Sequence, residues 1–178
     1  MLRKLSVNEF DALYEIMEQS FPPDERRPYG EQKALLSRPD YTVYASGQPV
    51  QAFLAVWSFD DFAFLEHFAV HPSARNTGLG SKLLGELISM LDKPLCLEVE
   101  PPEDELTCRR VRFYEKNGLF LNQFPYVQPP ISQGKRPVPL LLMTSERAVS
   151  QEEFEAHQSQ IYAKVYGVGR QPHEKRKD

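Results

Sequence analysis

The chain has 178 residues, of which 41% are hydrophobic and 26% charged, and these values predict one globular domain with a sizeable core. Its formal net charge of −4 gives no indication of general nucleic-acid binding. No apolar run approaches the roughly 20 residues of a membrane-spanning helix. The first residues lack the apolar segment of a secretory signal. We therefore expect a cytoplasmic protein with no nucleic-acid or membrane partner.

The chain contains two cysteines, Cys96 and Cys108, which lie far from a CxxC spacing. Two such isolated cysteines do not form a disulfide framework or a metal site by themselves. We therefore expect two reduced thiols and no metal ion.

The N-terminal part of the chain predicts two helices followed by three strands. Ser6, followed three residues later by Glu9, fits a capping box, and apolar residues at helical spacing predict a helix that ends before Phe21. A loop over residues 22–30 and a short helix over about 31–37 follow. Three β-rich runs joined by short links should be antiparallel neighbours; they cover residues 41–46, 50–59 and 62–70.

The stretch from His67 to Leu91 organises the rest of the chain. An apolar run ends at Val70, and residues 75–80 (RNTGLG) form a glycine-rich turn before an amphipathic segment. The order is therefore strand, turn and helix. The first amides of a helix have no internal partner, and together with the helix dipole they bind phosphate. We expect this turn to hold a pyrophosphate.

The second half of the chain predicts a crossover and two closing strands. A strand over residues 95–99 makes the strand–helix–strand unit a parallel, right-handed crossover. A helix from about residue 105 should end at Asn117-Gly118. The closing strands are expected over residues 119–124 and 139–144, with a proline-rich, functional or mobile loop over 125–139.

After residue 150 the composition becomes polar, and residues 170–178 are expected to be disordered. We predict a single α/β domain over residues 1–146, with a mixed, twisted sheet of about seven strands flanked by helices. A C-terminal helical extension and tail would cover 147–178. Whether the extension packs on its own domain or on a second copy stays open, so a homodimer is considered. The extension carries one weak apolar stripe at helical spacing, formed by Phe154, Ile161, Tyr162 and Val165.

Two motifs follow one another in this chain. The first is Arg-x-x-Gly-x-Gly, which begins at Arg75 after the strand that ends at Val70, and the second is RFYEKNG over residues 112–118. In this order and spacing they resemble the two signatures of the GCN5-related N-acetyltransferase (GNAT) family. The resemblance covers roughly residues 1–145. It implies a GNAT-like fold and an acetyl-CoA-dependent N-acetyltransferase, in which a primary amine attacks directly in a ternary complex.

The resemblance also implies how acetyl-CoA is held. The turn would bind the pyrophosphate, while the preceding strand would pair with the pantetheine arm and supply a backbone oxyanion donor. Seven residues before the signature tyrosine, where the family often has an asparagine, this chain has Thr107, which keeps a hydroxyl. The residues implied in cofactor binding are Phe68, Ala69, Val70, Arg75, Asn76, Thr77, Gly78, Leu79, Gly80, Ser81, Lys82 and Thr107.

The same resemblance implies a general acid and a general base. Tyr114 would protonate the departing thiolate. Glu66 lies on the strand before the turn, where several family members carry a glutamate or histidine base, and burial among aromatic residues should raise its pKa. By strand alternation Glu66 should share a face with Phe64 and Phe68. His67, on the other face, is a second candidate base.

The acceptor side is less defined by the sequence. Glu98 and Glu100 alternate on the next strand, and Glu100, at its end, is preferred for positioning the acceptor. Arg26 and Arg27 are candidates for meeting an anionic substrate. The loops that flank the acceptor in the family correspond here to residues 21–29 and 126–139.

Two other interpretations stay open. A non-catalytic acyl-CoA-binding module would keep the turn while Glu66 and Tyr114 do nothing. A dinucleotide-binding domain would explain Gly78-Leu79-Gly80 with an acidic residue 20 positions after Gly78. Against it, the third glycine position of GxGxxG is Leu83, and the preceding strand belongs to an antiparallel meander.

Overall fold

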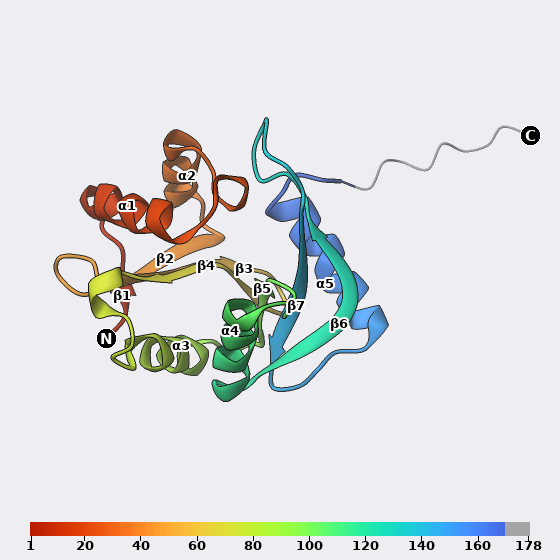
Figure 1. The fold of residues 1–178 in the computed structure, drawn as a ribbon. Helices are drawn as coiled ribbons and strands as arrows, with labels where there is room; N and C mark the ends of the chain where they lie inside the picture. The colour runs from red at the N-terminus through yellow and green to blue at the C-terminus, as the bar shows by residue number, and fades with distance from the viewer. Residues whose placement is uncertain (170–178) are drawn as a thin grey trace, which may run out of the picture.

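The computed structural model describes residues 1–169. In that part of the chain one seven-stranded sheet runs in the order β1-β2-β3-β4-β5-β7-β6 (Figure 1). β4 and β5 are parallel neighbours and the other pairs are antiparallel, as the short links and the crossover predict. The strands are β1 Arg3–Lys4, β2 Tyr41–Ser46, β3 Ala52–Ser58, β4 Ala63–Val70, β5 Leu95–Val99, β6 Leu119–Gln128 and β7 Val138–Ser145.

Helices cover both faces of this sheet. The α-helices are α1 Phe10–Ser20, α2 Tyr29–Ala34, α3 Leu79–Met90, α4 Glu105–Lys116 and α5 Gln151–Lys164. Figure 1 shows α1 and α2 on one face and α3 and α4 on the other, and the buried apolar side chains form two corresponding clusters. The predicted α/β fold, with a mixed seven-stranded sheet flanked by helices, is confirmed.

The loop expected over residues 125–139 is shorter, because both closing strands extend into it. β6 continues to Gln128, which pairs with Val138 of β7. β6 is an edge strand, and its pairing is interrupted between Asn122 and Tyr126, so Pro125 lies where the ladder is already broken. The connection that remains covers residues 129–137.

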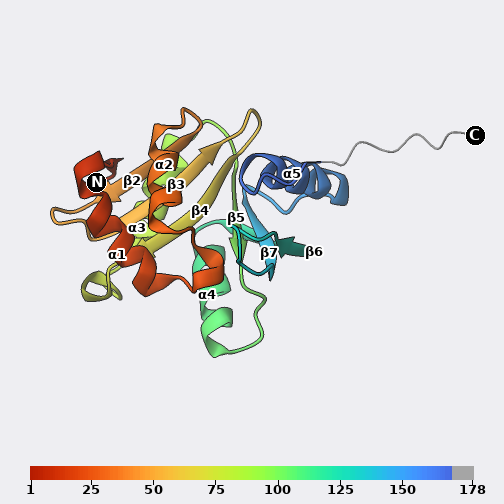
Figure 2. The same cartoon turned by 90° about the horizontal axis from the view of Figure 1, so that it is seen from above.

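The C-terminal extension packs on its own domain. Figure 2 shows α5 beside the β6–β7 end of the sheet. Its buried residues Phe154 and Ile161, with Val165 directly after it, belong to the same apolar cluster as Tyr126 and Phe62. The predicted apolar stripe is therefore confirmed. The expected disorder of residues 170–178 lies outside the described residues.

No helix within residues 1–169 combines the length and the apolar character that a membrane span requires.

Candidate active site

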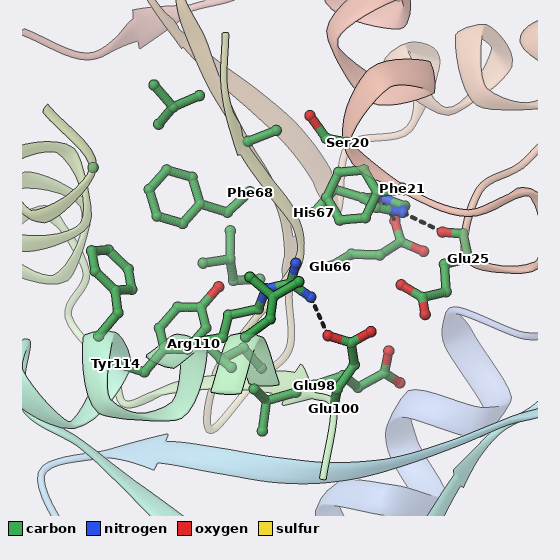
Figure 3. Close-up of a pocket in the computed structure, with 18 of the residues that line it drawn as sticks. Ser20, Phe21, Glu25, Glu66, His67, Phe68, Glu98, Glu100, Arg110 and Tyr114 are labelled. Atoms are coloured by element: carbon green, nitrogen blue, oxygen red, sulfur yellow. Dashed lines mark hydrogen bonds and ion pairs between the residues drawn. The ribbon is translucent and has the colours of Figure 1, made fainter. Parts of the chain in front are cut away.

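The sheet opens between its two central strands. β4 and β5 pair at three positions, the last of which joins Leu65 to Leu97. Beyond that point both strands line a cavity of about 760 Å³. Figure 3 shows Phe68 and Tyr114 on one side of this cavity and, gathered on the other, Glu25, Glu98 and Glu100.

A β-bulge lies at the same point of β4. The pairing with β3 shifts by one residue, so that Glu66 is an extra residue between Leu65 and His67. Leu65 and Phe68 consequently pack in the cluster on the α3 side, whereas Phe64 packs in the opposite cluster. Glu66 accepts from Trp57, which belongs to the same cluster as Phe64, so it shares a face with Phe64 as expected. It does not share one with Phe68, because the bulge shifts the alternation of the side chains that follow.

The glycine-rich turn begins α3 with a left-handed residue. Gly78 has a φ of +81°, a conformation that side-chain-bearing residues rarely adopt. The first hydrogen bond inside α3 runs from the Lys82 amide to the Gly78 carbonyl at 3.1 Å. The amides of Leu79, Gly80 and Ser81 come before Lys82 in the helix. These amides have no acceptor inside the helix. Free amides at the positive end of a 12-residue helix fit a pyrophosphate.

The predicted cofactor residues of the turn differ in where their side chains lie. Thr77 donates its hydroxyl to the Ala74 carbonyl at 2.8 Å, Leu79 packs against the apolar cluster, and Lys82 is exposed. The residues of the turn that line the cavity are Arg75, Asn76, Gly78, Gly80 and Ser81.

Strand β4 presents free backbone amides to the cavity. The His71 amide donates to a carbonyl on the β3 side at 2.7 Å, so by alternation the amide of Ala69 also faces β3. The amides of Phe68 and Val70 then face β5, where the pairing has ended. The Arg75 Nε donates to the Val70 carbonyl at 2.9 Å, which fixes the guanidinium at the end of this strand.

Tyr114 lies on the wall of the cavity that α4 provides. Its ring contacts Phe113 edge-on, with 5.2 Å between ring centroids. Burial raises the pKa of Tyr114 to about 12, so the hydroxyl stays protonated at neutral pH. A protonated hydroxyl at this position is a suitable acid for a departing thiolate.

Thr107 lies outside the lining of the cavity. Its amide donates to the Asp104 carboxylate at 2.8 Å, and its hydroxyl accepts from the Asp104 amide at 3.0 Å. The residue therefore closes the capping box of α4. Helix capping engages this hydroxyl, and the lining of the cavity gives no support for the expected cofactor contact.

Glu66 lines the cavity, but its carboxylate is buried against Arg27 and Trp57. Its side chain is 1% exposed, its Oε1 lies 2.7 Å from Arg27 Nη1, and its Oε2 accepts from Trp57 Nε1 at 3.0 Å. Burial alone would raise the pKa of Glu66, but the charge of Arg27, with His67 and Trp57, holds it below the usual value. The expected raised pKa was wrong, because a buried cation compensates the carboxylate.

Arg27 is likewise engaged within the protein. The residue is 5% exposed, pairs with Glu66, and donates from Nη2 to the Val165 carbonyl at 3.2 Å. The expectation that Arg27 meets an anionic substrate was therefore wrong. Arg26 contacts the Phe21 carbonyl at 3.3 Å.

His67 is a neutral, buried ring. Its Nε2 lies 2.7 Å from the Glu25 carbonyl, which can only accept, so Nε2 carries the proton. Burial lowers the pKa of His67, and within residues 1–169 its Nδ1 has no hydrogen-bond partner. The ring packs edge-on against Phe21 at 4.7 Å. These contacts favour a structural role.

Two carboxylates with raised pKa values face the cavity. Burial raises the pKa of Glu98 to about 7, although Tyr126 and Tyr166 donate hydrogen bonds to it. Burial also raises the pKa of Glu25, with the charge of Glu100 adding to the effect. The sequence did not single out Glu25, Tyr126 or Tyr166, because their neighbourhood arises only from tertiary contacts.

The loops expected to flank an acceptor do reach the cavity. Phe21, Pro22 and Glu25 come from the first loop, and Gln128 and Ile131 from the second. Glu100, preferred from the sequence, is paired with Arg110 of α4.

Comparisons with known proteins agree with this geometry. The family model described as "Acetyltransferase (GNAT) domain" matches residues 39–118. A Bacillus subtilis (strain 168) protein named "Putative acetyltransferase YjbC" is 29% identical over 157 residues, which cover 86% of this chain and 80% of the relative.

Solved structures give the same result. A structure named "Putative acetyltransferase from GNAT family" from Bacteroides thetaiotaomicron has a TM-score of 0.88 at 30% identity, and the match covers 94% of this chain and 99% of that chain. The ribosomal-protein-S18-alanine N-acetyltransferase from Escherichia coli shares the fold, with a TM-score of 0.64 at 22% identity over 85% of this chain and 96% of that chain.

A sheet that opens beside the free amides of a helix is the arrangement expected of a transferase that uses an acyl-CoA. The chain belongs to the GNAT family of N-acetyltransferases, whose cosubstrate is acetyl-CoA.

Proposed function

We propose that this protein transfers the acetyl group of acetyl-CoA to a primary amine by direct attack in a ternary complex. One observation carries the proposal. A single cavity joins the free amides at the start of α3, the unpaired edge of β4 and a group of carboxylates. The first two features suit the donor, and the carboxylates suit a cationic acceptor.

On the donor side, the amides of residues 79–81 would hold the pyrophosphate, with Arg75 and Asn76 on the adjacent wall. The amides of Phe68 and Val70 would bind the pantetheine arm and the thioester oxygen, which gains negative charge during attack. Their orientation toward β5, where no strand pairs with them, supports both roles.

Proton transfer would use Glu98 and Tyr114. A protonated amine must lose a proton before its nitrogen attacks, and a carboxylate with a pKa of about 7 is well matched to accept it, directly or through water. As the C–N bond forms and the C–S bond breaks, Tyr114 would protonate the sulfur, and the second proton of the attacking nitrogen would return to the Tyr114 oxygen, directly or through water. Glu98 replaces the sequence-based choice of Glu66, because Glu66 is ion-paired with Arg27 and has a lowered pKa.

Calorimetric titration with acetyl-CoA and CoA tests the donor half, with NAD as the negative control. Gly78→Arg places a side chain at a left-handed position beside the free amides, so we expect CoA affinity to fall more than tenfold. Gly85→Arg is the matched control, because Gly85 is an exposed α3 residue whose added side chain meets open space. Equal affinities of the two variants would contradict the proposed pyrophosphate site.

Thiol release with a panel of amines tests the transfer itself. The panel would include polyamines, amino acids, small aromatic amines and peptide N-termini. We expect acetyl-CoA-dependent thiol release with at least one amine. CoA binding without turnover on any amine would favour the non-catalytic acyl-CoA-binding module.

A further inference from the structure

Glu98 is held by a tyrosine that lies far along the chain. The Tyr166 hydroxyl lies 2.8 Å from both Oε1 and Oε2 of Glu98, although 68 residues separate the two residues. Tyr166 follows α5, outside the part of the chain that matches the family model. We propose that Tyr166 is a positioning residue for Glu98, and that the end of α5 thereby completes the acceptor half of the site. This inference rests on the proposed function, because it takes Glu98 as the proton acceptor.

A second contact from the same segment supports this assignment. The carbonyl of Val165 accepts from Arg27 at 3.2 Å, and Arg27 is the cation paired with Glu66. The Val165 side chain is itself buried in the apolar cluster, which anchors the segment. Two successive residues after α5 therefore hold two charged groups beside the cavity.

The charge state of Glu98 depends on groups from all surrounding elements. Burial raises the pKa of Glu98 most, and the negative charges of Glu66 and Glu25 raise it further. The hydrogen bonds from Tyr126 of β6 and from Tyr166 lower it. Within residues 1–169, the other titratable or charged groups that line the same cavity are His67, Arg75, Tyr114 and the pair Glu100–Arg110, and Cys96 lies two residues before Glu98 on β5.

Tyr166→Phe removes the hydroxyl and keeps the ring. Losing a donor to the charged carboxylate raises the pKa of Glu98, so more of the base is protonated at a given pH. We expect the pH midpoint of the acidic limb of the kcat/KM profile to rise by about one unit. At pH values below that midpoint, kcat/KM should then fall roughly tenfold. Tyr162→Phe is the matched control, because Tyr162 lies on α5 four residues before Tyr166 and its hydroxyl bonds the Val127 carbonyl instead.

A readout without turnover separates this inference from the proposed function. Carbon-13 NMR of glutamate-labelled protein titrates Glu98 directly, with Glu98→Gln for assignment. An upward shift of the Glu98 titration in Tyr166→Phe, absent in Tyr162→Phe, supports the positioning role, even if no amine is acetylated and the proposed function fails. Identical Glu98 titrations in wild type and Tyr166→Phe overturn the inference, even if the enzyme is active. Thermal unfolding confirms that each variant is folded.

Discussion

Two glutamates on the strands that border the cavity have opposite surroundings. Glu66 faces the buried guanidinium of Arg27, which holds its pKa below the usual value. Glu98 has tyrosine hydroxyls for partners, and burial raises its pKa to about 7. The residue type is identical, so the assignment of roles depends on which neighbours the fold supplies.

Removing the cation is expected to destabilise the fold. Arg27→Met leaves the Glu66 carboxylate buried without compensation, which costs about 3–5 kcal/mol of unfolding free energy at neutral pH. The pKa of Glu66 is lowered in the folded state, so the pair with Arg27 stabilises the wild type at pH values above the unfolded pKa of Glu66. This stabilisation is lost as the pH falls through the folded pKa. The free energies of unfolding of wild type and variant, measured with urea, should therefore converge at acidic pH.

The double variant Arg27→Met, Glu66→Gln is the control for that experiment. It removes both charges and should be more stable at neutral pH than Arg27→Met alone. Equal stabilities of the single and double variants would show that the uncompensated charge is not the cause.

Tyr114→Phe tests the general acid. We expect kcat to fall about 10²–10³-fold with acetyl-CoA affinity nearly unchanged, because the ring stays and only the proton donor is lost. Steady-state kinetics with calorimetry separates the two effects. Tyr44→Phe, on β2 away from the cavity lining, is the comparison variant. An unchanged kcat would assign the proton transfer to water or to another group.

At the level of single elements, periodicity and caps were sufficient to predict the helices and strands to within a few residues. The capping box of Ser6 and Glu9 lies just before α1, and the glycine-rich turn lies just before α3, so both indicated where a helix begins. The β-bulge at Glu66 was not predictable, since an inserted residue leaves the composition of the strand unchanged. Glu66 itself stays on the face of Phe64, where Arg27 and Trp57 engage its carboxylate, and this makes the sequence-based assignment of the base unsuitable.

At the level of the whole molecule, α5 is part of the core and not an appended helix. Its residues pack with β6 and β7 on the α1 face of the sheet. The sequence predicted the helix from a weak stripe, but its docking surface exists only once β6 and β7 have paired in the folded sheet. The contacts of Tyr126 and Tyr166 with Glu98 depend on that docking, which explains why the sequence did not indicate them.

Ile161→Ala measures how firmly α5 is docked. Ile161 is fully buried, so the variant should lose about 2–5 kcal/mol of unfolding free energy. Chemical denaturation is the measurement, and Ser159→Ala, at an exposed position on the same helix, should change it by less than about 0.5 kcal/mol. A loss that is equally small in both variants would mean that α5 contributes little to the folded core.

The proposed donor and acceptor halves of the cavity are encoded very differently. The groups assigned to acetyl-CoA come mainly from one contiguous stretch, residues 68–81, inside the matched family segment. Glu98 and its neighbour Glu66 lie inside that segment, but the other groups around Glu98, at residues 25, 126 and 166, lie outside it. Mutation can therefore retarget the enzyme to another amine without altering its donor, and sequence likeness confined to the donor stretch carries little information about the amine acetylated.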